Sequence, residues 1–165
     1  MDRTATDNAK QRLTEGLRNH GAHLSLEDAV ADFPHRLMNQ KPPYVPYSFW
    51  HQLEHIRIAQ EDLLLYAAEP QHRSPSWPDG YWPSGEAEAD RATWDTTISA
   101  IQCDRERFIE LISDPERDIF APVKHMEGRT VFRTALLAID HTAYHLGEFV
   151  MGRQMLGHWR SDLTR

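Results

Sequence analysis

The chain has 165 residues, of which 40% are apolar and 26% are charged, a composition typical of a soluble globular protein. Its net charge of -7 argues against a phosphate-binding surface, so we expect no nucleic-acid partner. The single cysteine, Cys103, excludes an internal disulfide and any zinc site built from several cysteines.

Helical spacing recurs along the chain and β-branched alternation is rare, which predicts an all-α fold. A first helix is expected over residues 4–19, with a stop at Gly21. The next segment opens with Ser25 and has Asp28 three residues later. This spacing resembles a capping box and predicts a short helix that ends before Pro34.

Three more long helices are expected after a proline-rich loop, NQKPPYVPYS. Ser48 can cap the first of them, FWHQLEHIRIAQEDLLLYAA, whose apolar residues recur with a period near 3.6. Another helix is expected from about Glu86 to Ser113, and the last from near Thr130 to about Leu156. The sequence therefore predicts a four-helix bundle with a short extra helix in the first connection.

A long segment, Pro70 to Gly85, separates two of these helices and is rich in Pro, Trp and Tyr. It shows no periodicity, and loops of this length often have a function, although a packed surface cover is equally expected. Its aromatic residues Trp77, Tyr81 and Trp82 either roof a pocket or pack against the bundle.

The last expected helix carries His141 and His145 in the stretch AIDHTAYHLGEFVMGR. Residues four apart lie on one helix face, about 6 Å apart, so both imidazoles can reach one ion. The same face carries Thr134, Ala138 and Gly152, whose small size leaves room for an ion. The other positions are apolar nearly all round, which predicts a buried helix whose histidines need partners. Core histidines share this spacing, so the pair alone is a weak signal.

Two familiar metal motifs are not met. HExxH requires a glutamate where this chain has Thr142. A di-iron bundle requires Glu-x-x-His, but Gln52 precedes His55 at that spacing. The apolar stripe of the same helix places His55 at its flank and His51 towards solvent, so geometry favours His55 as a third ligand. Three imidazoles plus water is the open arrangement of catalytic zinc.

The stretches SFWHQLEHIRIAQEDLL and DHTAYHLGEFVMGRQMLGHW resemble the DinB-like superfamily of bacterial four-helix-bundle proteins. The family pattern is a histidine within a Leu-x-His-Ile-x-x-Ala-like stretch and an HxxxH in the last helix. The resemblance spans roughly residues 10–160 and includes SLEDAVADFP and YWP. It implies that His55, His141 and His145 bind a divalent metal, most often described as zinc or nickel in this family.

The resemblance further implies a metal-dependent enzyme similar to small-thiol S-transferases, with a low-molecular-weight thiol as its partner. Three alternatives stay open: a metal-dependent hydrolase, a non-enzymatic metal-binding or stress-associated bundle, and a metal-free interaction module. Glu148 lies on nearly the same face as the histidines and can orient an imidazole. Tyr144 and Cys103 are expected to be buried packing residues.

We expect one domain over residues 1–165. The first residues are polar and show no apolar signal-peptide core, and no run approaches 18 apolar residues. These features predict a cytoplasmic protein without a membrane partner. A homodimer is a further possibility that the sequence leaves open.

Overall fold

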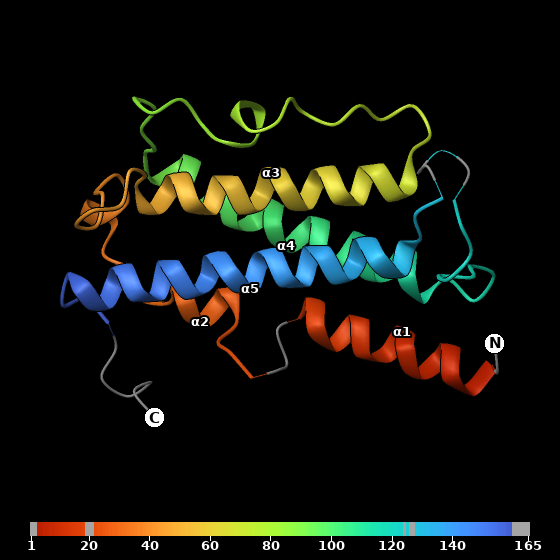
Figure 1. The fold of residues 1–165 in the computed structure, drawn as a ribbon. Helices are drawn as coiled ribbons and strands as arrows, with labels where there is room; N and C mark the ends of the chain where they lie inside the picture. Colours follow the sequence, from red (N-terminus) through yellow and green to blue (C-terminus); the bar gives the residue numbers. More distant parts are fainter. Residues whose placement is uncertain (1–2, 19–21, 124, 126–127, 160–165) are drawn as a thin grey trace.

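The computed structural model describes residues 3–18, 22–123, 125 and 128–159 and consists of helices packed side by side (Figure 1). The long helices are α1 (Arg3–Leu17), α3 (Phe49–Ala68), α4 (Arg91–Ser113) and α5 (Val131–Met155). Three short ones lie in the connections: α2 (Leu26–Val30), η1 (His35–Leu37) and η2 (Asp79–Tyr81). Within the described residues the chain forms no β-strand, so the expected all-α fold is confirmed.

The long helices form a bundle in which α3 packs against both α4 and α5. Helix α1 packs against α4 and α5, and the short α2 packs against α5 (Figure 1). Because α2 lies between α1 and α3 in the chain, the predicted extra helix in the first connection is confirmed. Among the described helices, none has both the length and the apolar character that crossing a bilayer requires.

Short polar side chains set the helix starts. Ser25 accepts a hydrogen bond from the backbone N–H of Asp28, whose carboxylate accepts from the Ser25 backbone, so the predicted capping box is present. Ser48 and Thr130 each accept from the backbone N–H three residues further on. Each contact satisfies an N–H group that has no partner within the helix. The predicted starts of α2, α3 and α5 are therefore confirmed.

Helix α4 begins at Arg91, so the expected start at Glu86 is wrong. The Asp90 carboxylate accepts from the backbone N–H of Thr93 at 2.7 Å, and Asp90 has an extended backbone. A capping residue of this kind marks the start of a helix, because its own backbone is not helical. Helix α1 ends at Leu17, and the stop expected at Gly21 lies outside the described residues.

Two clusters of buried apolar side chains form the core. One joins α2, α3, α4 and the end of α5 around the rings of Phe33, Phe49, Trp94 and Phe149. The other joins α1 to the ends of α3 and α4 and to the start of α5, and it includes Leu13, Leu64, Phe108, Ile112, Val131 and Ala138. Along α5, the segment between these clusters is the one that carries the two histidines.

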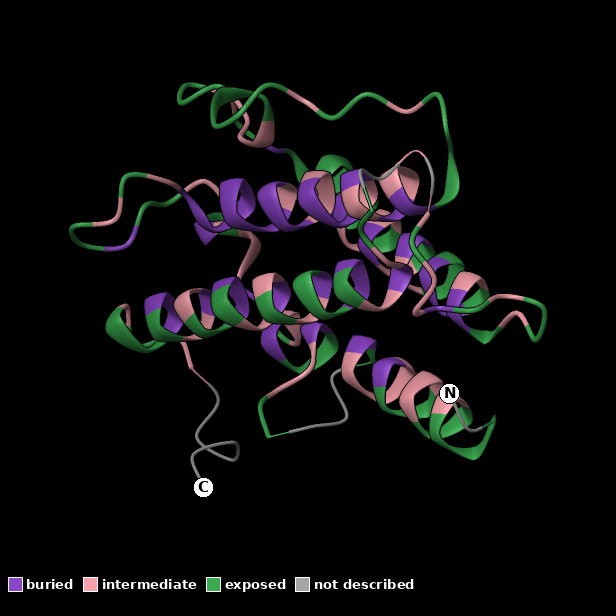
Figure 2. Cartoon of the chain, turned by 45° about the vertical axis from the view of Figure 1, so that its right-hand side comes forward, coloured by how far each residue is buried: buried purple, intermediate pink, exposed green. Residues whose placement is uncertain are grey.

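One side of α5 is exposed, so the prediction that this helix is buried all round is wrong (Figure 2). Its exposed side chains are Leu136, Leu137, Tyr144, Met151 and Met155. Helices α1, α2, α3 and α4 all contact α5, and the face that carries these exposed side chains meets solvent. Tyr144 is 64% exposed and Cys103 is also exposed, which corrects the expectation that both are buried packing residues.

Candidate metal centre

Three histidines meet inside the bundle. The Nε2 atom of His55 lies 3.0 Å from Nε2 of His141 and 3.1 Å from Nε2 of His145. Their ligand nitrogens all lie within 4.8 Å of one another, and among the described residues this group includes no cysteine or carboxylate. Two ligands of a tetrahedral zinc ion lie about 3.3 Å apart. The two short distances are close to that spacing.

The packing of α5 against α3 brings these side chains together. His141 and His145 lie one helical turn apart on the face of α5 that meets α3. His55 and His145 are 2% and 7% exposed, and His141 is half-buried. The structure thus brings together the three residues predicted as ligands, while metal binding itself stays a prediction.

Hydrogen bonds fix which ring nitrogens of His55 and His145 carry a proton. Nδ1–H of His55 donates to the backbone carbonyl of Tyr81 at 2.7 Å. Nδ1–H of His145 donates to the carboxylate of Glu148 at 2.8 Å. Both partners can only accept, so each neutral ring keeps its lone pair on Nε2. In both rings this lone pair faces the other histidines.

The environment also favours the uncharged form of two rings. Burial lowers the pKa of His55, and for His141 burial together with repulsion from the neighbouring rings lowers the pKa to about 3. A metal binds only to neutral imidazole, because a proton and an ion compete for the same lone pair. Near neutral pH, His55 and His141 are therefore in the form that a metal ligand needs.

The Glu148 carboxylate collects several hydrogen bonds beside the cluster. Its Oε2 accepts from His145, from the Tyr47 hydroxyl at 3.3 Å and from Nε2 of Gln52 at 3.2 Å. Burial, and then the charge of Glu148, raises the pKa of Tyr47 to about 12, so this hydroxyl remains a donor. Glu148 therefore lies beside the cluster in contact with His145, and its role in orienting that imidazole stays a prediction.

The segment that follows α3 folds back along this helix (Figure 1). The indole of Trp82 stacks on the His55 ring at 3.8 Å and 5°, and the Tyr47 ring stacks on Trp82 at 4.6 Å. Trp77, by contrast, is 77% exposed. Of these aromatic residues, Trp82 packs directly on the ring of His55.

His51 is buried, so its expected exposure to solvent is wrong. It is 4% exposed, with Nδ1 at 2.6 Å from the Ser48 hydroxyl and Nε2–H donating to the Ser84 carbonyl at 2.9 Å. Ser84 belongs to the segment folded over α3, and the spacing of apolar residues within α3 carries no information about that cover. His51 therefore has its own partners and does not join the three histidines.

Three further residues at the site were not singled out as partners from the sequence. Tyr47 and Gln52 bind Glu148, and the backbone of Tyr81 binds His55. Tyr47 comes from an irregular loop and Tyr81 acts through its carbonyl, so neither leaves a periodic signal. Gln52 stands one helical turn before His55 on α3. This spacing places both side chains on one helix face, and it is the sequence signal that could have indicated Gln52 as a site residue.

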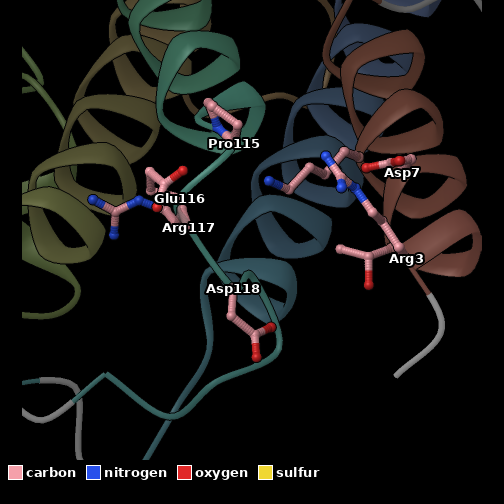
Figure 3. Close-up of a pocket in the computed structure, with 8 residues that line it drawn as sticks. Arg3, Asp7, Pro115, Glu116, Arg117 and Asp118 are labelled. Carbon is pink, nitrogen blue, oxygen red and sulfur yellow. The ribbon is translucent and has the colours of Figure 1, made fainter.

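A separate cavity of about 460 Å³ lies between α1 and the segment after α4 (Figure 3). It is lined by charges of both signs, which include Arg3, Asp7, Glu116, Arg117 and Asp118. Figure 3 shows Glu116 and Arg117 on one side and Arg3 and Asp7 on the other, without a common focus. This cavity contains no histidine and does not compete with the histidine cluster as a candidate metal centre.

One comparison with known proteins gives a match. The sequence model of the DinB superfamily matches residues 21–149, a range that contains all three clustered histidines. The chain matches no curated protein and no solved structure in these comparisons. The family match covers most of the chain, and the helical bundle is consistent with it. The chain belongs to the DinB superfamily.

Proposed function

We propose that the chain binds one divalent metal ion, zinc or nickel, and is a metal-dependent enzyme that acts on a low-molecular-weight thiol. The ligands would be the Nε2 atoms of His55, His141 and His145. The observation that carries the proposal is the 3.1 Å distance between Nε2 of His55 and Nε2 of His145. In both rings the proton is on Nδ1, so each Nε2 presents a lone pair.

Two lone pairs at this distance repel each other unless a proton or a cation lies between them. A proton is disfavoured on His55, because burial lowers the pKa of that ring. A divalent cation accepts both lone pairs at once, and Nε2 of His141 would supply a third lone pair to the same ion. Neutral imidazoles with oriented Nδ1–H groups are the donor set that zinc and nickel accept.

The count of donors favours a catalytic over a structural site. Structural zinc sites are closed by four protein ligands, whereas catalytic sites have three and keep one position for a substrate or water. Among the described residues the group offers three nitrogens, and Glu148 is engaged with His145. A divalent ion held there would lower the pKa of a thiol in the remaining position.

The chain's own residues would orient and shield such a thiol. Trp82 stacks on His55 and Tyr47 stacks on Trp82, and this aromatic layer would limit the access of water to the site. A cavity of about 150 Å³ lies beside Tyr47, Gln52 and Glu148, with Met151 among the apolar residues on its other walls. This cavity can hold a small apolar group of the substrate next to the site.

The family resemblance supports thiol transfer as the reaction. In such a reaction the thiol sulfur forms a bond to an electrophilic carbon while the bond from that carbon to its leaving group breaks. The thiol proton passes to solvent. The histidines, Glu148 and the aromatic cover would act by positioning and by excluding water.

The test is a metal-dependent transfer assay. Metal-free protein is loaded with zinc or nickel and mixed with a panel of small thiols and alkylating electrophiles, and adducts are identified by mass spectrometry. We expect adduct formation with the loaded protein, and loss of it without metal or in His145→Ala. His23→Ala, an exposed histidine, is the matched control. Hydrolysis of the electrophile without an adduct would replace the transferase by a hydrolase, and no turnover by loaded protein would leave a non-enzymatic metal-binding bundle.

A further inference from the structure

Tyr81 is held at both of its ends. Its hydroxyl donates to Oδ2 of Asp62 at 2.7 Å, and its backbone carbonyl accepts from Nδ1–H of His55, also at 2.7 Å. Burial, and then the hydrogen bond to Asp62, raises the pKa of Tyr81 to about 12, so its hydroxyl stays a donor. A single residue therefore connects a carboxylate on α3 with a histidine of the cluster on the same helix.

Asp62 is a buried carboxylate with only 7% of its surface exposed. It stands two helical turns after His55, on the same side of α3. Besides Tyr81, it accepts from Nε2 of His72 at 2.7 Å. A buried carboxylate is costly unless its oxygens are hydrogen-bonded. Here both donors come from the segment that folds back over α3, so Asp62 ties this segment to the helix.

The same segment touches the histidine side of α3 at two further points. Trp82 stacks on His55, and the Ser84 carbonyl accepts from His51. The segment is otherwise largely exposed and lies along the outer side of α3 (Figure 2). These two contacts act on residues one and three positions after Tyr81, whereas the hydrogen bond to Asp62 acts on Tyr81 itself.

We propose that Asp62 and Tyr81 are positioning residues of the metal centre. Asp62 holds Tyr81 so that its carbonyl keeps the proton on Nδ1 of His55 and leaves the Nε2 lone pair facing His141 and His145. Partners of this kind set the tautomer and the orientation of a metal-binding histidine. This inference rests on the proposed metal binding for its consequence, whereas the tautomer of His55 can be measured without any metal.

The first readout is the tautomer of His55 in metal-free protein. Long-range proton–nitrogen NMR spectra distinguish a ring protonated at Nδ1 from one protonated at Nε2. We expect His55 in the wild type to be protonated at Nδ1, and Tyr81→Phe, which removes only the hydroxyl, to give a mixture of both forms. Tyr66→Phe is the matched control, because Tyr66 lies on α3, the helix of His55, and packs its ring against Arg129.

The second readout is the affinity for zinc ion, measured in competition with a chelating dye. Loss of a hydrogen-bonded partner behind a metal ligand typically costs 10–100-fold in affinity, so we expect the Kd of Tyr81→Phe to rise about 10-fold. Asp62→Asn should weaken binding at least as much, and Tyr66→Phe should leave the Kd unchanged. If Asp62→Asn does not fold, Tyr81→Phe decides the question alone.

The outcomes separate this inference from the proposed function. If the wild type binds zinc and Tyr81→Phe has the same His55 tautomer and the same Kd, the positioning role is overturned and the metal site is retained. Equal losses in Tyr81→Phe and Tyr66→Phe overturn it as well, and so does a tautomer change with an unchanged Kd. Wild type that binds neither zinc nor nickel overturns the proposed function, and the NMR spectra then still show whether Asp62 and Tyr81 orient His55.

Discussion

Glu148 is the side chain on which the polar contacts around the histidines converge. It accepts hydrogen bonds from His145, Tyr47 and Gln52 through one oxygen, and its side chain is 30% exposed. Its charge makes the bond to His145 stronger than a bond between neutral groups. It also increases electron density on the ring and so strengthens Nε2 as a ligand.

We therefore predict that Glu148→Gln binds zinc at least about 10-fold more weakly than the wild type, with the fold retained. The amide keeps the shape of the carboxylate but loses its charge, so Nδ1 of His145 has a weaker acceptor. Calorimetric titration of metal-free protein measures the effect, with the exposed Glu110→Gln as control. An unchanged zinc affinity in Glu148→Gln would show that the carboxylate does not support the site.

For single residues, the sequence predicts those site residues that follow helical spacing or the family pattern, and it misses those whose partners lie in irregular segments. His141 and His145 follow helical spacing, and the family resemblance adds His55. Asp62 is one of several charged residues on α3, and its partners come from a segment without periodicity. The burial of His51 depends on the same segment, and this is why its predicted exposure is wrong.

At the scale of elements, the close approach of α5 to the start of α3 depends on Gly152. A Cβ atom there would lie 2.9 Å from Cγ of Pro42 and 3.0 Å from Cε1 of Phe49. Gly152 was expected to leave room for an ion, but the space beside it is filled by these two side chains. Its small size serves the packing of the helices.

We predict that Gly152→Ala lowers the free energy of unfolding by about 1–3 kcal/mol, because the core around Phe49 must shift. Gly147→Ala on the same helix should raise it by about 0.5–1 kcal/mol, since a Cβ there meets nothing within 4 Å and alanine favours the helix. Urea unfolding of the two variants provides the comparison. Equal stability of both variants would contradict the close packing at Gly152.

Hydrogen bonds between Glu27 on α2 and Gln102 and Arg105 on α4 lead to a prediction about stability and pH. Burial alone would raise the pKa of Glu27, but hydrogen bonds from Arg105 and Gln102 outweigh it and lower the pKa from 4.5 to about 2. A carboxyl with a lowered pKa stabilises the fold above its unfolded pKa. This contribution is lost as the pH falls from about 4.5 to about 2.

Glu27→Gln should therefore be less stable than the wild type near neutral pH, by about 1 kcal/mol or less because the pair is partly exposed. The difference should shrink as the pH falls through the range from 4.5 to about 2. Thermal unfolding of both proteins across this range measures it, with Glu110→Gln as the variant that removes an exposed carboxylate of α4. A difference that stays constant down to the lower pH would rule out this ion pair as its source.

The elements themselves are largely predictable from the sequence. Ser25, Ser48 and Thr130 cap helices at the expected positions, because a capping residue acts on its own neighbours along the chain. The start expected at Glu86 is too early, because the cap at Asp90 sets the start of α4 at Arg91. The exposed face of α5 was not predictable, since it depends on which helices pack around it and not on its own composition.

At the scale of the whole molecule, the two apolar clusters lie on either side of the histidines along α5. Each is formed by at least three helices, so neither requires the histidines to hold it together. The fold should therefore persist without metal, and metal binding should add stability only through its preference for the folded state. The helical bundle is therefore expected to fold whether or not the histidine site binds a metal.

The most direct test of metal binding is the stoichiometry of zinc bound to metal-free protein, measured by calorimetric titration beside far-ultraviolet circular dichroism. We predict one ion per chain for the wild type and for the exposed-histidine control His23→Ala. His55→Ala, His141→Ala and His145→Ala should each lose the tight site while keeping the helical spectrum of the wild type. A wild type that takes up no zinc or nickel, or a His55→Ala variant that binds as tightly as the wild type, would contradict a three-histidine metal site.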